Sequence, residues 1–380
     1  MRFGNGSFMH IAVIFGTRPE AIKMAPVVQA LRAEPGVTCR VWSTGQHRQM
    51  LDQVLGLFDL RADGDLGLMK PGQSLNELFA AAVTGVDALL KAHRPDLVLV
   101  HGDTTTAAAA ATAAFNLGVA VGHVEAGLRS GRMDQPWPEE FNRRLVDMVS
   151  TLMFAPTERA RANLLAEGAT RERVLVTGNT VVDALLTMIE RMAAQPDVRA
   201  RLDQRFSFLD AEKRLVLVTG HRRESFGEGF GNICKAIGRL GESENLEIIY
   251  PVHLNPNVQG PVHALLDGYD RVHLVEPVDY ESFVYLMDRC DVILTDSGGV
   301  QEEAPTLGKP VLVMREVTER PEAVEAGVSH LVGTDPNRIV SGVFDALGQK
   351  ARNDQSNPYG DGRASRRIVQ GILDAADHLR

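Results

Sequence analysis

Carboxylates and guanidinium groups gather around two prolines and a tryptophan in the stretch HVEAGLRSGRMDQPWPEEFNRRLVD. Glu125 ends an apolar run, whereas Glu139 and Arg143 lie four residues apart on a predicted helix, as do Glu140 and Arg144. Side chains four apart share a helix face, so each pair is expected to touch. An active-site segment that works with acids and bases would have this composition, although a solvated loop with exposed ion pairs would have it too.

Two further groups suited to proton transfer follow apolar runs. Asp103 in HGDTTT precedes a predicted helix, where it can act as an acid or base or simply cap the helix. His221 in VTGHRRE has arginine neighbours and can protonate or hydrogen-bond a phosphate leaving group near neutral pH. A lone histidine is more often structural, so both alternatives stay open for each residue.

The stretch TDSGGVQEEAPTLGKP is typical of a nucleotide site. Gly298 and Gly299 let the backbone approach a ligand, and free N–H groups at a helix start attract phosphate. Glu302 or Glu303, one turn later, can accept hydrogen bonds from ribose hydroxyls. A plain tight turn into a helix is the alternative, but serine, two glycines and two glutamates together favour a nucleotide.

The stretch FGTRPEAIKMAPV indicates a second place for an anion. Pro19 suits the first turn of a helix, and Arg18 and Lys23 then flank the helix N-terminus, where cations are unfavourable unless an anion joins them. An ordinary charged surface helix is the alternative. Neither G-x-G-x-x-G at a strand-to-helix turn nor G-x-x-x-x-G-K-[ST] occurs, so neither a nicotinamide cofactor nor an NTPase is indicated.

Short apolar runs separated by helical patterns must position these groups. Such runs predict strands buried on both faces of a parallel sheet, and their polar residues collect at the strand ends, where open α/β sheets bind ligands. The pattern predicts two doubly wound α/β domains, with residues 1–178 in the first and 179–365 in the second. The runs are residues 10–15, 39–43, 96–102, 119–124 and 152–155, then 214–220, 246–252, 271–277, 291–296 and 309–314.

Composition narrows the class of protein. The chain has 380 residues, a formal net charge of −9 and 44% hydrophobic residues, which predicts a globular protein and gives no reason to expect a nucleic acid or an anionic membrane as partner. Three well-separated cysteines predict reduced, buried thiols without a disulfide framework or zinc site. We find no membrane span or signal peptide, and expect a cytoplasmic protein.

The chain resembles the bacterial non-hydrolysing UDP-N-acetylglucosamine 2-epimerases from about residue 10 to residue 375. The resemblance implies a GT-B-type fold, in which two Rossmann-like domains face each other across a cleft, with a C-terminal helix at residues 366–380 crossing back to the first domain. It also implies a homodimer. The motifs that carry it are GTRPEAIKMAPV, TGQHRQML, HGDTTT, HVEAGLRSG, PWPEEFNRR, VTGNTVVDAL, VTGHRRESFG, YPVHLNPNV, DSGGVQEEAPTLGKPVLVMREVTERPEAV and NPYGDG.

The family's reaction interconverts UDP-GlcNAc and UDP-ManNAc, which supplies ManNAc units for cell-surface polysaccharides. UDP is expelled from C1 while the C2 proton leaves, giving 2-acetamidoglucal, and UDP then adds back with a proton delivered to the other face of C2. This route needs carboxyl groups near C2 and cations or donors on the diphosphate. It implies no NAD and no metal.

The resemblance also implies roles for individual residues. For catalysis it implies Asp103, Glu125, Glu139, Arg143 and His221. For UDP binding it implies Arg18, Lys23, Phe283, Ser297, Gly298, Gly299, Glu303 and Arg320. Parts of a second, allosteric UDP-GlcNAc site match Gln46, Gln49, Gln73 and His253, although Gly72 stands where some relatives carry arginine.

Three other functions use the same features. A GT-B glycosyltransferase would need an acceptor site and no acid/base cluster around Glu139. A hydrolysing epimerase would release free ManNAc and usually carries a fused sugar-kinase domain, which nothing in this chain resembles. A non-catalytic nucleotide-sugar sensor would keep DSGGVQEE but could dispense with Asp103, Glu125 and Glu139.

Overall fold

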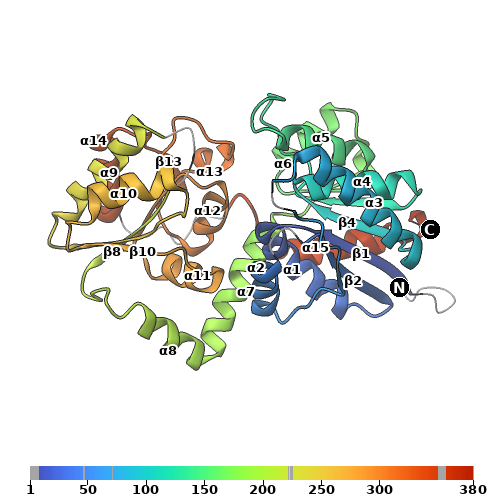
Figure 1. The fold of residues 1–380 in the computed structure, drawn as a ribbon, viewed down its shortest axis with the longest axis horizontal. Coiled ribbons are helices and arrows are strands. Elements are labelled where there is room, and N and C mark those ends of the chain that lie inside the picture. Colours follow the sequence, from blue (N-terminus) through green and yellow to red (C-terminus); the bar gives the residue numbers. More distant parts are fainter. Residues whose placement is uncertain are drawn as a thin grey trace. The chain divides into compact units, whose positions relative to one another are not determined.

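The computed structural model describes residues 8–45, 48–70, 72–220, 222, 226–349 and 357–379. The chain forms two units, one made of Met1–Ala184 and Gly360–Arg380 and the other of Leu185–Tyr359 (Figure 1). The division falls inside one helix, after Ala184, whereas the sequence suggested a boundary after residue 178.

Within the described residues, unit 1 contains a seven-stranded parallel sheet in the order β3-β2-β1-β4-β5-β6-β7. The order reverses between β1 and β4, the topological switch point at which ligands bind in open α/β sheets. The strands are β1 (Met9–Phe15), β2 (Val37–Ser43), β3 (Gly64–Asp65), β4 (Leu97–His101), β5 (Ala120–Val124), β6 (Leu152–Ala155) and β7 (Val174–Val176).

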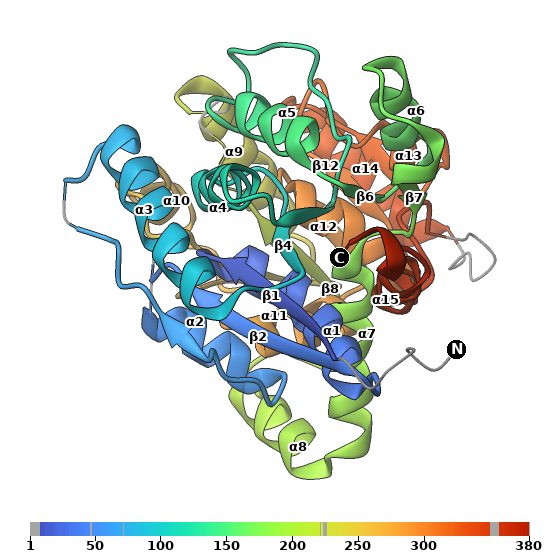
Figure 2. The same ribbon diagram turned by 90° about the vertical axis from the view of Figure 1, so that its right-hand side faces the viewer.

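Helices cover both faces of this sheet. The third, fourth and fifth helices pack side by side on one face, and the first and last lie on the other (Figure 2). The fourth is rich in alanine, and its alanines are buried, which lets its neighbours approach closely. The helices are α1 (Arg18–Ala33), α2 (Arg48–Leu57), α3 (Leu75–His93), α4 (Thr105–Asn116), α5 (Glu139–Val149), α6 (Glu158–Ala166), α7 (Thr180–Ala194) and α15 (Ala364–Asp374).

The carboxylate of Asp183, on α7, fixes the start of α15. It accepts hydrogen bonds from the backbone N–H groups of Ala364 (3.1 Å) and Ser365 (2.8 Å), and from the Ser365 hydroxyl (2.5 Å). These contacts join the part of the chain that leaves unit 1 to the part that returns to it. They explain why the beginning of α7 remains with unit 1.

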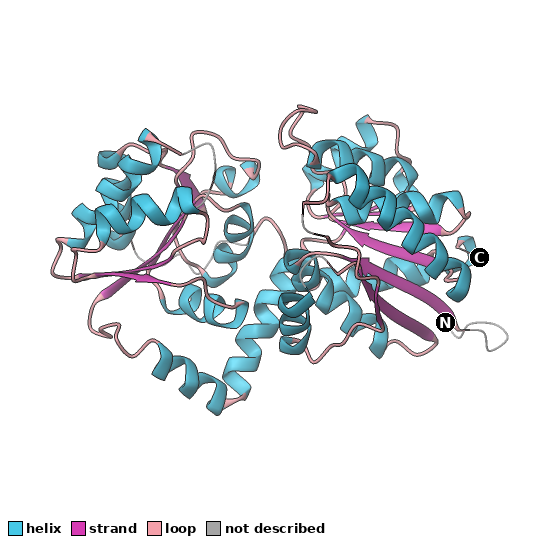
Figure 3. Ribbon diagram, in the orientation of Figure 1, coloured by secondary structure: helices cyan, strands magenta, loops and turns pink. Residues whose placement is uncertain are grey.

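Within the described residues, unit 2 contains a six-stranded parallel sheet in the order β10-β9-β8-β11-β12-β13, which reverses between β8 and β11. Helices again lie on both faces (Figure 3). The strands are β8 (Arg214–Thr219), β9 (Leu246–Pro251), β10 (Val272–Val275), β11 (Val292–Thr295), β12 (Val311–Val313) and β13 (Ser329–Leu331). The helices are α8 (Pro196–Arg205), α9 (Glu228–Gly241), α10 (Pro256–Leu266), α11 (Tyr280–Arg289), α12 (Gly298–Glu303), α13 (Pro321–Glu325) and α14 (Pro336–Gly348).

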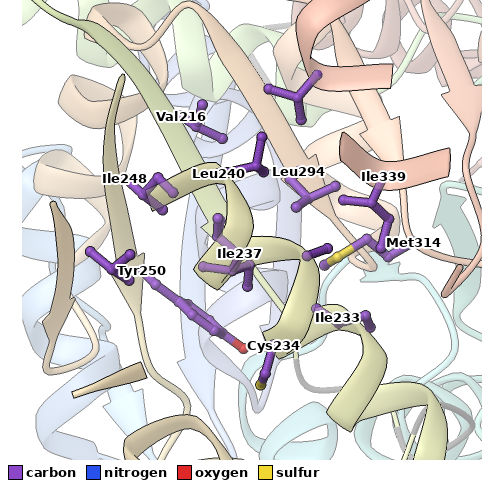
Figure 4. Packing of buried hydrophobic residues seen from close by; sticks show 14 of the residues in the cluster. Val216, Ile233, Cys234, Ile237, Leu240, Ile248, Tyr250, Leu294, Met314 and Ile339 are labelled. Carbon is purple, nitrogen blue, oxygen red and sulfur yellow. The ribbon is translucent and has the colours of Figure 1, made fainter. Parts of the chain in front are cut away.

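The core of unit 2 lies between its sheet and α9. Ile237 and Leu240 of α9 meet Ile248 of β9 and Leu294 of β11, and all four are fully buried (Figure 4). The hydroxyl of buried Tyr250 donates to the carbonyl of Gly220 (2.9 Å), at the end of β8. The core therefore also fixes the carboxyl end of a strand beside the switch point.

The structure confirms the predicted fold class, because both units are parallel sheets wound on both faces. Each of the ten predicted runs coincides with a strand. The sequence did not predict β3, β7 and β13, which are only two or three residues long. Over the described ranges, none of the helices has the length and apolar character required to cross a membrane.

Candidate active site

A buried glutamate joins the two loops at the switch point of unit 1. Thr17 and Glu20 form a capping box at the start of α1. Glu20 accepts hydrogen bonds from the N–H groups of Gly16 (3.1 Å) and Thr17 (2.8 Å), and from the hydroxyl of Thr104 after β4 (2.7 Å). Burial raises the pKa of Glu20 although these bonds oppose the rise. Apart from the capping pattern, no feature of the sequence indicates this link.

Glu125, directly after β5, lies at the centre of a polar cluster. Its Oε1 atom accepts from Lys23 Nζ of α1 (2.5 Å) and from Asn179 Nδ2 (2.9 Å). Its Oε2 atom lies 3.5 Å from Nε2 of His101, the last residue of β4. The cluster therefore brings together predicted residues Glu125 and Lys23 with two that the sequence did not single out.

The backbone at this point is held in an unusual conformation. Glu125 has φ of +69°, which costs a residue with a side chain about 1–2 kcal/mol and is often found at functional sites. Gly102, with φ of +64°, faces it, and an added Cβ would lie 3.3 Å from Glu125 Oε2. Glycine is therefore needed at position 102 both for its backbone conformation and for the close approach.

A buried histidine supports the same turn from within the sheet. His123 of β5 lies between Asp147 Oδ1 (2.6 Å, from Nδ1) and the carbonyl oxygen of Gly102 (2.8 Å, from Nε2). The other oxygen of Asp147 accepts from Gly127 N–H (3.3 Å) and contacts Arg129 Nη2 (2.8 Å). The turn that carries Asp103 is therefore anchored to α5, which contains Asp147.

Arg143 does not form the pair that helical spacing suggested. Its guanidinium contacts the carboxylate of Asp103, and its Nη1 donates to Glu140 Oε2 (3.3 Å) rather than to Glu139. The neighbouring Asn142 donates to the carbonyl oxygen of Asp103 (2.9 Å). The reason is tertiary, since the loop after β4 approaches α5 and offers a carboxylate on the side of Arg143.

The two adjacent glutamates at the start of α5 differ in environment. Glu140 is fully buried and accepts from Ser130 N–H (3.0 Å) and from Arg144 Nε (2.9 Å), the predicted i,i+4 pair. Glu139 is half-buried, and its Oε2 atom is buried without a hydrogen-bond partner among the described residues. An unsatisfied buried acceptor is costly and calls for an explanation.

Polar groups also collect at the switch point of unit 2. Ser297 is the N-cap of α12, yet its side chain makes no capping hydrogen bond, and its backbone N–H donates to the hydroxyl of Thr295 (3.0 Å). Gly298 and Gly299 begin the helix. Glu303, at its end, is buried and accepts from the Tyr280 hydroxyl of α11 (2.7 Å).

Arg320 lies against the start of the same helix. Its Nε donates to Glu302 (2.9 Å) and its Nη1 to Glu319 (3.2 Å). A Cβ added at Gly298 would lie 3.1 Å from the Arg320 guanidinium carbon, so glycine leaves room for this cation. Phe283, half-buried, belongs to α11, the helix that also supplies Tyr280.

The remaining predicted residues are less informative. His221 and Gln46 lie outside the described residues, and Gln49 falls in α2 without a described side chain. Gln73, in unit 1, accepts from the N–H of Lys70 (3.2 Å). Arg18, the first residue of α1, and His253, which follows β9 in unit 2, are both exposed. The side chains that the structure describes include no group of three or more His, Cys, Asp or Glu placed to hold a metal ion.

Comparisons with known proteins match nearly the whole chain to one family. A family model for UDP-N-acetylglucosamine 2-epimerase matches residues 29–373. The UDP-N-acetylglucosamine 2-epimerase of Yersinia pestis is 52% identical over 369 residues, 96% of this chain and 98% of the relative. The crystal structure of UDP-GlcNAc 2-epimerase from Neisseria meningitidis bound to UDP-GlcNAc superposes with a TM-score of 0.90 at 47% identity, covering 96% of this chain and 100% of that one. The Methanocaldococcus jannaschii enzyme in complex with UDP-GlcNAc and UDP gives a TM-score of 0.81 at 34% identity, covering 96% and 99%.

Proposed function

The chain belongs to the UDP-N-acetylglucosamine 2-epimerase family, and we propose that the carboxylates at the switch point of unit 1 carry out its proton transfers. The enzyme is a non-hydrolysing epimerase that interconverts UDP-GlcNAc and UDP-ManNAc. The observation that carries the proposal for the site is the buried Oε2 atom of Glu139, which has no hydrogen-bond partner among the described residues. A group that must exchange a proton with substrate needs such an uncommitted oxygen.

The reaction sets the requirements for these groups. In the elimination step, the electrons of the C2–H bond form the C1=C2 double bond, the C1–O bonding pair leaves with UDP, and a carboxylate takes the proton. In the re-addition step, UDP attacks C1 and a carboxyl group delivers a proton to the opposite face of C2. Asp103, Glu125 and Glu139 are the proposed acid and base groups, and Arg143 orients the carboxylate of Asp103, which it contacts.

In this proposal, UDP binds to the residues that the resemblance assigned to UDP binding. Free N–H groups at the start of α12 and the Arg320 guanidinium suit a diphosphate, Glu303 suits the ribose hydroxyls and Phe283 the uracil. Arg18, Lys23 and His221 complete the set on the strength of the motif match. The elimination route is redox-neutral, so the proposal calls for no NAD, and no metal takes part in it.

Incubation with UDP-GlcNAc in D2O, followed by NMR of the sugar, tests the mechanism. We expect UDP-ManNAc that carries deuterium at C2 and, with time, deuterium in the recovered UDP-GlcNAc. Epimer formed without solvent label would contradict proton exchange at C2. Accumulation of free ManNAc would indicate hydrolysis, and transfer of the sugar to an added acceptor would indicate a glycosyltransferase.

A homodimer and a cytoplasmic location are further parts of the proposal. The three cysteines are buried and unpaired, as suits a reducing compartment. Exposed apolar side chains support self-association: Phe141 and Met148 lie seven residues apart on α5, hence on one face, and Phe115 belongs to the adjacent α4. We expect light scattering to give a dimer that Met148→Glu weakens. An unchanged dimer would place the interface elsewhere.

A second UDP-GlcNAc site formed by Gln46, Gln49, Gln73 and His253 also stays a proposal. Initial rates should then rise sigmoidally with UDP-GlcNAc, and Gln73→Ala should make the curve hyperbolic. A hyperbolic curve for the unmodified enzyme would contradict activation by substrate.

A further inference from the structure

One buried titratable side chain next to the proposed proton-transfer groups has no role in the mechanism above. His101, the last residue of β4, is 4% exposed. Its Nε2 atom has no hydrogen-bond partner among the described residues and lies 3.5 Å from Glu125 Oε2. A movement of about 0.5 Å would bring the two atoms to ordinary hydrogen-bond distance.

The two oxygens of Glu125 are not equivalent. Oε1 accepts from Lys23 Nζ and from Asn179 Nδ2, so a cation stabilises negative charge on that atom. Oε2 lies 3.5 Å from Nε2 of the His101 ring. A proton carried by Glu125 therefore resides better on Oε2, since there it does not displace the bond to the Lys23 ammonium group.

Burial keeps the ring of His101 neutral. Burial lowers the pKa of His101 to about 4, although the Glu125 carboxylate acts to raise it, while Lys23 of α1 and His123 of β5 lower it further. A neutral imidazole has one donor and one acceptor nitrogen. With its proton on Nε2, the ring can donate to an ionised Oε2 and can still donate to a lone pair of that oxygen when Oε2 is protonated. No ring proton has to move, and no second positive charge arises beside Lys23.

We propose that His101 is a positioning residue that acts through Glu125, holding Oε2 in one orientation whether or not Glu125 carries the proton taken from C2. The proposal rests on the proposed catalytic role of Glu125. His101 itself neither touches the sugar nor keeps the proton. Its contribution is that the carboxylate does not rotate or lose its partner when the proton arrives or leaves.

Two amide substitutions of His101 test this idea as a matched pair. His101→Gln places an amide at the position of Nε2, where it can donate or accept, whereas His101→Asn places one near Nδ1, too short to reach Oε2. We expect kcat to fall about tenfold in His101→Asn and less than about threefold in His101→Gln, with KM unchanged in both. His263→Asn, which changes an exposed histidine of α10, should keep the wild-type kcat. Circular dichroism and melting temperature report whether each variant folds.

A double-mutant cycle separates action through Glu125 from a purely structural role. In a Glu125→Gln background, His101→Asn should cause no further loss of kcat, because the proton-carrying group is already absent. The same tenfold loss in that background, or equal kcat values for the Asn and Gln variants, would overturn the inference. If kcat falls strongly in Glu125→Gln but stays at the wild-type value in His101→Asn, only the inference about His101 is overturned. If kcat stays at the wild-type value in Glu125→Gln, the proposed role of Glu125 is overturned as well.

Discussion

Replacing Lys23 with methionine would show how much the cation beside Glu125 contributes to stability. Methionine keeps the length and apolar stem of lysine but lacks the ammonium group, so the 2.5 Å contact from Nζ to Glu125 Oε1 is lost. The two side chains are only 12% and 9% exposed. The carboxylate of Glu125 would therefore remain buried without its cation.

The size of the effect follows from that burial. Removing one partner of a buried ion pair costs about 3–5 kcal/mol. Asn179 still donates to Glu125 Oε1 in the variant, so we expect the lower end of this range, about 3 kcal/mol. For a unit of roughly 200 residues, that loss lowers the melting temperature by about 6–12 °C.

Lys91→Met is the matched control, because Lys91 and Asp87 form the same kind of pair on the surface of α3. Their 2.8 Å contact joins side chains that are 63% and 34% exposed, so its loss should cost about 0.5 kcal/mol or less. Calorimetry of both variants at pH 7.5 gives the comparison. A shift for Lys23→Met no larger than that for Lys91→Met would refute the reasoning.

Three further changes test other parts of the site. Glu139→Gln should keep the affinity for UDP, measured by calorimetric titration, but lower kcat by about 10²–10⁴-fold; wild-type turnover would remove Glu139 from the catalytic set. Tyr280→Phe deprives buried Glu303 of its 2.7 Å donor and should weaken UDP binding by about tenfold, so an unchanged Kd would contradict a ribose-binding role for Glu303. Burial tends to raise the pKa of Asp147, but His123 and Arg129 outweigh it and lower the pKa. Asp147 therefore stabilises the fold at neutral pH and loses this contribution as the pH falls below about 4. In urea denaturation the stability gap between wild type and Asp147→Asn should close with falling pH, and a constant gap would contradict this.

The sequence predicted the sheets well because burial on both faces leaves a strong local signal. Each of the ten apolar runs became a strand. Arg18 and Asp103 follow β1 and β4, between which the strand order of unit 1 reverses, and Glu125 follows the next strand, β5. The three strands it missed have only two or three residues and do not stand out as apolar runs. Strand β12 is equally short but lies within the longer apolar run KPVLVM. An apolar run of this length is a local feature, so it can be recognised in a single sequence.

The contacts inside the site depended on distant parts of the chain and could not be predicted in this way. Helical spacing correctly indicated the Glu140–Arg144 pair, but it could not indicate the contact of Arg143 with Asp103, which lies on a separate loop. His101 looks like the end of an apolar strand, and its importance appears only when Glu125 is placed beside it.

Unit 1 is built from two chain segments, and the second of them is synthesised only after unit 2. Its last helix, α15, packs against α1, yet it is made only after all of unit 2. Ile368 and Ile372 of α15 are fully buried. The surface of unit 1 against which they pack therefore stays exposed to solvent until α15 has been translated. Because chains emerge from the ribosome N-terminus first, we expect the N-terminal unit to be the last completed. A chain that stops after Tyr359 would expose an apolar surface and should need a chaperone to stay in solution.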